Sequence, residues 1–219
     1  MDSMRWPEAN FPLSLKVSAN LDPQSRNLIL DAMDGWERAA NLDFFAPLQT
    51  TPNLNFPDLI DYYRKDKAVQ GIYLATNKIT ELDDTILAVA QLIFFTNRDN
   101  PTQPFYQIVH TDIVLNGYYF KFSTDRLDET TYYLMTLVMH EVGHVLGLGH
   151  TNQGIMYPSL STTDKQDTLT AFDVDLINAK YNTIPTSANE NALNMNSSVP
   201  SDYQRVLLYL PRGTNSVGR

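Results

Sequence analysis

The sequence predicts an α+β domain, because two kinds of apolar pattern are spread along the chain. Apolar residues recur at helical spacing in long segments, and short runs rich in β-branched and aromatic residues lie between those segments. The length of 219 residues suits one domain with a full core, and 43% hydrophobic residues with 19% charged residues argue against a disordered chain.

The first elements are a strand and a helix near the N-terminus. Residues 14–17, Ser-Leu-Lys-Val, alternate between polar and apolar side chains, as a half-buried strand does. Asp22 followed by Pro23 favours a helix start, because aspartate caps free N–H groups and proline suits the first turn. The helix is expected to reach about Ala40. Its buried face is predicted from helical spacing to contain Leu28, Leu30, Met33, Trp36 and Ala40.

Four further strands and two further helices are expected in the rest of the domain. The strands are predicted over residues 44–48, 70–76, 86–95 and 107–116. A helix should begin near Asp128, because Asp128 and Glu129 would suit the positive end of its dipole. Its buried side is predicted to contain Leu134, Leu137, Val138, Val142 and Val145. The last helix should run from about Thr168 to Tyr181.

The segment from His140 to His150 has the pattern H-E-x-x-H-x-x-G-x-x-H. Because an α-helix advances about 100° per residue, His140 and His144 lie on one face and can bind one ion. Glu141 follows the first histidine and can hold a metal-bound water without being a ligand. Gly147 can adopt the positive φ that ends helices, so the chain can turn and bring His150 to the same ion.

This pattern predicts one catalytic Zn²⁺ ion. Three neutral imidazoles leave the fourth tetrahedral position open for water, as catalytic zinc sites do. Zinc lowers the pKa of such a water toward about 7, and Glu141 can act as the general base in amide hydrolysis. Coincidence is a poor alternative, since three of the four histidines lie in this motif. The remaining one, His110, is expected to be a packed or surface residue of a strand.

The residues after His150 resemble the metzincin clan of zinc endopeptidases. Met156 stands where that clan has the Met-turn, a hydrophobic floor beneath the histidines, and Met-Tyr-Pro at 156–158 is similar to the matrixins. The resemblance implies a metzincin fold with a twisted, mostly parallel five-stranded sheet, an antiparallel edge strand, two long helices, the Met-turn and a C-terminal helix. It implies a catalytic domain over residues 1–182, with the upper subdomain ending at about 147 and the lower one spanning 148–182.

The resemblance also implies where a peptide would bind. In metzincins an extended peptide pairs antiparallel with the edge strand, and the S1′ pocket is lined by the active-site helix and the segment after the Met-turn. The corresponding residues here are Leu87, Ala88, Val89, Tyr157, Pro158 and Leu160. The alternative for residues 86–92 is an ordinary buried strand, since they lack alternation.

The segment 169–173 resembles the start of the matrixin C-terminal helix, where two acidic residues are usual. Only Asp173 is present, and the resemblance implies that its carboxylate holds the Met-turn backbone; the alternative is a simple acid at a helix start. Phe172 replaces the other acid, which in matrixins can bind a freed N-terminal ammonium.

Composition limits the partners and cofactors. The net charge of −9 disfavours nucleic acid and anionic membranes, and no apolar run reaches transmembrane length. The resemblance implies a peptide or protein substrate, and we expect a monomer. Calcium stays open: Asp83, Asp84 and Asp112 lie near strand ends, but no loop has recognisable calcium spacing. Without cysteine the chain contains no cysteine switch.

Residues 1–7 contain no apolar signal segment. By analogy with the family we expect an extracellular or cell-envelope protein whose leader is absent from this chain, with a cytoplasmic location as the alternative.

The composition changes after Tyr181. Residues 182–200 are rich in Asn, Ser, Thr and Pro, as loops and linkers are, and 206–210 form a short apolar run. We expect residues 183–219 to be an extension packed on the domain. The alternative is an inhibitory segment in the cleft of its own or a neighbouring molecule.

Three hypotheses of function follow. The first is a zinc endopeptidase in which Glu141 is the base. The second is a zinc-binding protein that recognises peptides with little turnover. The third is a dedicated processing protease that acts on one partner or on itself. The intact Glu141 favours hydrolysis.

Overall fold

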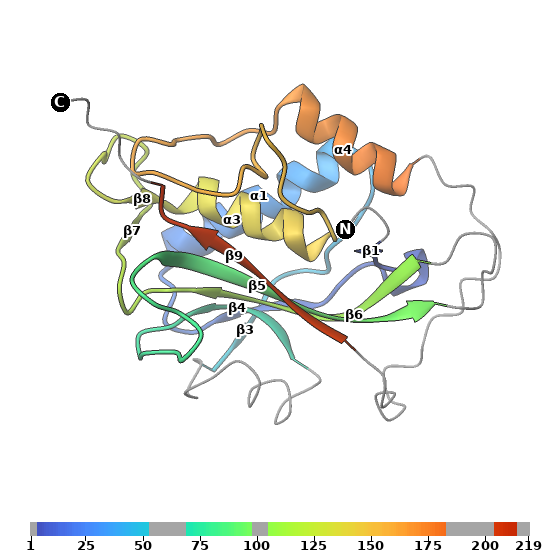
Figure 1. Ribbon diagram of the computed structural model, residues 1–219, viewed down its shortest axis with the longest axis horizontal. Coiled ribbons are helices and arrows are strands. Elements are labelled where there is room, and N and C mark those ends of the chain that lie inside the picture. Colours follow the sequence, from blue (N-terminus) through green and yellow to red (C-terminus); the bar gives the residue numbers. More distant parts are fainter. Residues whose placement is uncertain (1–3, 53–68, 98–104, 183–203, 214–219) are drawn as a thin grey trace.

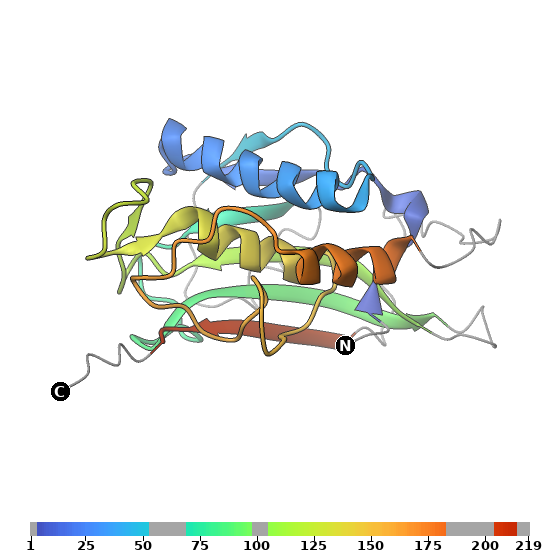
Figure 2. The ribbon, with the colours of Figure 1, turned by 90° about the horizontal axis from the view of Figure 1, so that it is seen from above.

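A mixed β-sheet covered on one face by helices forms the framework of the protein (Figures 1 and 2). A computed structural model describes residues 4–52, 69–97, 105–182 and 204–213. Seven strands in these ranges form the main sheet, in the order β3-β2-β4-β6-β5-β9, with β1 pairing with β6. The strands are β1 (Met4–Arg5), β2 (Leu15–Ser18), β3 (Gln49–Thr51), β4 (Gln70–Leu74), β5 (Ile86–Asn97), β6 (Phe105–Leu115) and β9 (Gln204–Pro211).

The pairing directions agree with the predicted fold class. The pairs β1–β6, β2–β3, β2–β4 and β4–β6 are parallel, whereas β5 pairs antiparallel with β6. Four of the five expected strands are present in this sheet, as β2, β4, β5 and β6, and β1, β3 and β9 complete it. A separate parallel pair, β7 (Phe122–Ser123) and β8 (Tyr132–Tyr133), precedes the central helix. The α+β, mostly parallel arrangement expected from the sequence is therefore confirmed.

The second predicted strand is misplaced. Its regular pairing begins only at Gln49, as β3, and Phe45 makes an isolated bridge with Leu13. The physical reason is side-chain packing: the Phe44 ring contacts the rings of Phe11 and Tyr181 at centroid distances of 5.0 and 5.2 Å. Phe44 is therefore part of the hydrophobic core and does not belong to a regular strand.

Three α-helices and one short 3-10 helix lie in the described residues: η1 (Glu8–Asn10), α1 (Pro23–Ala40), α3 (Leu134–Val145) and α4 (Ala171–Tyr181). Helix α1 begins as predicted, because the Asp22 carboxylate accepts a 2.9 Å hydrogen bond from the Ser25 N–H. No helix in these ranges is long and apolar enough to cross a membrane.

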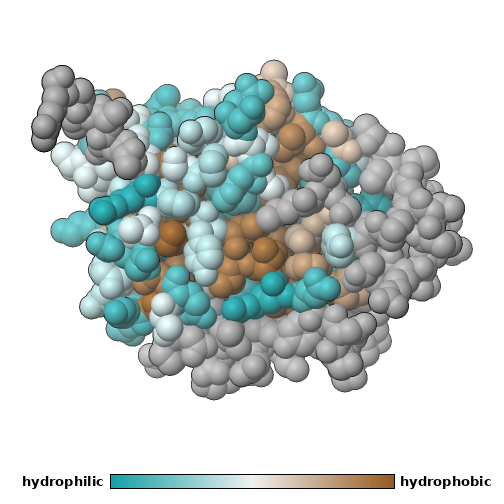
Figure 3. All heavy atoms as spheres, viewed as in Figure 1, coloured by the Kyte–Doolittle hydropathy of each residue, from teal (hydrophilic) through white to brown (hydrophobic). Residues whose placement is uncertain are grey.

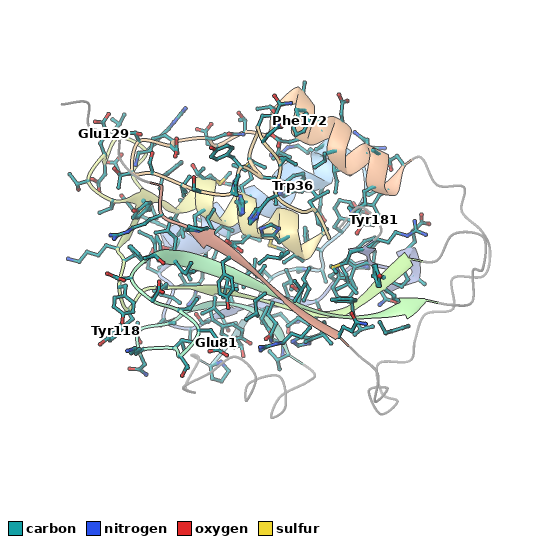
Figure 4. The ribbon with its side chains drawn as sticks, in the orientation of Figure 1. Trp36, Glu81, Tyr118, Glu129, Phe172 and Tyr181 are labelled. Atoms are coloured by element: carbon teal, nitrogen blue, oxygen red, sulfur yellow. The ribbon has the colours of Figure 1, made fainter. Side chains whose placement is uncertain are left out.

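The predicted buried face of α1 needs one correction. Leu30 is 38% exposed, whereas its neighbour Ile29 is fully buried. Ile29 lies seven residues before Trp36, about two helical turns, so the two share a face, and Leu30 lies about 100° further around the helix. Trp36 is a core residue, as expected, and its Nε1–H donates to the Met139 carbonyl at 2.9 Å (Figure 4). This bond joins α1 to α3.

Helix α3 begins later than predicted. It starts at Leu134, so Asp128 and Glu129 lie outside it. The Asp128 carboxylate instead accepts hydrogen bonds from the Thr130 N–H and hydroxyl and from the Thr131 hydroxyl, which close a turn and hold the pKa of Asp128 well below its usual range. Every residue of α3 is buried, so this helix has no solvent-facing side.

The cap of α1 gives a stability test. Asp22→Ala should lower the free energy of unfolding by about 1 kcal/mol, because an N–H group at the helix start loses its acceptor. Asp31→Ala, in the exposed middle of the same helix, should change it by less than about 0.5 kcal/mol. Urea denaturation of both variants would measure the difference, and equal midpoints would contradict the role of the cap.

Candidate active site

Helix α3 and the turn after it bring the three histidines of the motif together. His140 and His144 lie one turn apart on α3, and Gly147, at φ 80°, ends the helix with its N–H donating to the His144 carbonyl. The chain then turns back and places His150 beside them. One ligand nitrogen from each ring lies within 4.8 Å of the other two. In the part of the chain that the structure describes, no other group of three potential ligands is this close.

Hydrogen bonds from the backbone orient two of the imidazoles. His140 Nδ1 lies 2.7 Å from the Ile155 carbonyl oxygen, and His144 Nδ1 lies 2.8 Å from that of Leu148. A carbonyl oxygen can only accept, so each Nδ1 carries the proton and donates it. Each Nε2 is consequently left with a lone pair for a metal ion, the arrangement that second-sphere partners give to metal-binding histidines.

Burial keeps the histidines neutral. Loss of hydration lowers the pKa of His140 to about 3, lowers that of His144 well below its usual value, and lowers that of the more exposed His150. Neutral imidazole is the form that binds a metal. The site is therefore prepared to accept a cation at neutral pH.

The unsatisfied atoms of the site fit a zinc ion. Among the residues that the structure describes, His140 Nε2 and both carboxylate oxygens of Glu141 have no hydrogen-bond partner although they are buried, which is costly unless another group binds there. The Nε2 atoms of His144 and His150 lie 3.2 Å apart. Two nitrogens at about 2.0–2.1 Å from a tetrahedral zinc would lie about 3.3 Å apart. The three imidazoles thus have the chemistry and the spacing of a zinc site.

Met156 packs directly against the metal-binding helix. It is fully buried, and a Cβ atom added to Gly143 would clash with its sulfur atom and approach Trp36 to 3.0 Å. Glycine at 143 is therefore required by close packing between α3, α1 and the Met156 turn. The Thr151 N–H donates to the Met156 carbonyl at 2.9 Å and closes that turn.

Asp173 links the last helix to this turn. Its carboxylate accepts from the Ile155 N–H at 2.9 Å and, at the start of α4, from the Thr170 N–H at 2.8 Å. It therefore both holds the turn backbone and caps the helix, so the two interpretations of Asp173 are compatible. A chain of contacts runs from Asp173 through Ile155 to His140. The role of Ile155 was not predicted, because every residue has a backbone carbonyl and the residue type therefore does not indicate this hydrogen bond.

Phe172, which stands in place of a second acid, is partly buried at the start of α4 (Figure 4). The N-terminal ammonium, which such an acid can bind in matrixins, lies outside the described residues. At the other end of α4, Lys180 donates from Nζ to the Met4 carbonyl at 2.7 Å, which fixes the start of the described chain to this helix.

A cavity of about 550 Å³ adjoins His140. Of the six residues that the resemblance assigns to peptide binding, Tyr157 and Leu160 line it, and Pro158 is exposed between them. Leu87, Ala88 and Val89 lie in β5 with fully buried side chains, so only their backbone groups face a neighbouring strand. Strand β5 pairs with β6 on one side and with β9 on the other, so residues 86–92 are not the edge strand that the resemblance implied but an interior strand, as the alternative had it. A second hollow is lined by His150, Thr151 and Leu176.

His110 is packed in the sheet. Its Nε2 lies 2.7 Å from Asp112 Oδ2, and both residues are buried. Asp112 also accepts from the Gly71 N–H at 3.1 Å, and burial raises its pKa. Asp83 accepts from Thr85. These two candidate calcium ligands therefore already have partners within the protein.

Asp173 provides a test of how the site is supported. Asp173→Asn should lower stability by about 1–3 kcal/mol, because the acceptor for two backbone N–H groups is weakened. It should also lower zinc affinity about 10- to 100-fold, since the carbonyl that orients His140 is no longer held. Asp175→Asn, an exposed site on the same helix, is the control. Competition with a chromophoric chelator would measure the zinc affinity of both variants. Equal zinc affinities would contradict the role of Asp173 in supporting the histidines.

Comparison with known proteins agrees with this geometry. The family model for matrixins matches residues 11–182. A segment of 54 residues is 41% identical to the metalloendoproteinase 2-MMP of Arabidopsis thaliana, and it covers 24% of this chain and 14% of that protein. The chain thus matches only a small part of that relative's length. The family match extends over most of the sequence and includes the histidine motif, the Met156 turn and α4, so this chain belongs to the matrixin family.

Proposed function

We propose that the protein is a zinc-dependent endopeptidase. His140, His144 and His150 would hold one Zn²⁺ ion. The observation that carries the proposal is the buried side chain of Glu141 next to the histidine cluster, because its two carboxylate oxygens have no hydrogen-bond partner in the described part of the chain. The family to which the chain belongs supports the same chemistry.

Different residues of the chain would have different roles in hydrolysis. Zinc, when bound, would supply the Lewis acid that polarises the scissile carbonyl and makes water more acidic. Glu141 would take the proton from the attacking water and later give it to the leaving amine. The carbonyl groups of Ile155 and Leu148 keep the imidazoles in orientation throughout.

We further propose that a peptide substrate lies extended beside β5. After displacing β9, which now pairs with this side of β5, the peptide would pair with the backbone of Leu87, Ala88 and Val89, and one of its side chains would enter the cavity lined by Leu160 and Tyr157. Support comes from the position of this cavity, which has His140 in its wall. Ile155, Leu160 and Leu210 contribute apolar surface to this cavity, whereas most of its other lining residues are polar.

Glu141→Ala tests the role of the base. The variant should keep one zinc per chain, because the ligands are intact, and should lose about 10²- to 10⁴-fold in cleavage rate, the usual contribution of a general base. Glu129→Ala, at an exposed turn, is the matched control and should retain the wild-type rate. Mass spectrometry would measure the zinc content of each protein, and a random peptide library would measure the cleavage rate.

Equal cleavage by the wild-type protein and Glu141→Ala would contradict the proposed base. One bound zinc with no cleavage by any of the three proteins would favour the alternative, a zinc-binding protein that recognises peptides with little turnover.

A further inference from the structure

The C-terminal strand β9 covers the outer side of β5. It runs antiparallel to β5, with Ala88 opposite Leu210 and Leu92 opposite Val206 (Figures 1 and 2). After the strand, the Arg212 N–H donates to the Thr85 carbonyl at 2.8 Å. The backbone groups on this side of β5 are therefore already used by the chain itself.

The same segment is also bound from its other side. The Leu160 N–H donates to the Pro211 carbonyl at 3.1 Å, and the Gly213 N–H donates to the Leu160 carbonyl at 2.7 Å. Leu160 and Arg212 form a parallel bridge. Residues 204–213 thus include an extended backbone held between β5 and the segment after Met156, as a peptide lies in a groove.

One side chain of this segment, that of Leu210, forms part of the wall of the cavity beside His140. Leu210 is 1% exposed and lines the cavity together with His140, Thr136 and Leu160. Leu208, two residues earlier, is buried on the same face, whereas Leu207 and Tyr209 pack against the opposite face of the sheet. In Figure 3 apolar residues gather in the middle of the face that β9 crosses.

We infer that residues 204–213 occupy the peptide groove as an internal competitor of substrate, with Leu210 in the position of a substrate side chain. This inference rests on the proposed function. A peptide that paired with β5 would need the same N–H and C=O groups that now bind β9, and these groups cannot serve two strands. A tethered segment competes at an effective concentration of about millimolar or more, so a micromolar substrate is displaced.

The inference also names the class of ligand that the groove takes. The ligand is an extended peptide with a leucine-like side chain beside His140 and a second apolar residue two positions earlier, where Leu208 lies.

The first experiment measures cleavage of a fluorogenic peptide by zinc-loaded full chains. Leu210→Asp should raise kcat/KM at least about tenfold, because an aspartate cannot stay in the buried position and β9 leaves the groove. Leu127→Asp makes the same change at a leucine that is 85% exposed and should leave kcat/KM unchanged. Circular dichroism checks folding; if Leu210→Asp does not fold, Leu210→Ser replaces it.

The second experiment does not depend on catalysis. A labelled peptide with the sequence of residues 204–213 is added to zinc-loaded Glu141→Ala, with and without Leu210→Asp, and binding is followed by fluorescence anisotropy. The peptide should bind the double variant at least about tenfold more tightly, since its groove is vacated. A peptide carrying aspartate at position 210 should bind at least about tenfold more weakly than the unchanged peptide.

The outcomes separate the two proposals. Peptide binding that is absent, or equal with and without Leu210→Asp, overturns the inference whatever the activity. The expected binding pattern without cleavage by any chain overturns the proposed endopeptidase and leaves the groove and its internal occupant established. Active wild-type protein with no gain in Leu210→Asp contradicts competition by β9.

Discussion

The structure depends on bringing a ligand nitrogen from each of three histidines to within 4.8 Å of the other two. Two carbonyl groups satisfy this requirement by accepting the Nδ1 protons of His140 and His144. Those carbonyls must themselves be fixed. The turn at Gly147 positions Leu148, and the carboxylate of Asp173 holds Ile155, so the start of α4 is part of the support of the site.

Burial of α3 follows from the same requirement. The helix packs between the sheet and α1, and its hydrogen bond from Trp36 and its contact with Met156 leave no room for a side chain at residue 143. Dense packing of this kind limits movement of the ligands, which a catalytic metal site requires. It also buries the side chain of Glu141 completely.

Short sequence motifs predicted the features that depend on residues close together in the chain. The H-E-x-x-H-x-x-G-x-x-H spacing identified the histidine cluster, and Asp22 with Pro23 gave the start of α1. Other features depend on contacts distant in sequence. The threonines after Asp128 draw its carboxylate into a turn, so α3 begins later, and Ile29 displaces Leu30 from the buried face. The pairing of β9 with β5 joins segments more than a hundred residues apart and leaves only a short apolar run as a sign in the sequence.

The most direct measurement of the central claim is X-ray absorption at the zinc edge of the zinc-loaded full chain, with metal content determined on the same sample. We expect one zinc per chain with three imidazole nitrogens at about 2.0–2.1 Å, and loss of one imidazole in His150→Ala. More than one zinc per chain, or an unchanged number of imidazoles in His150→Ala, would contradict the assignment of the three histidines as the metal site.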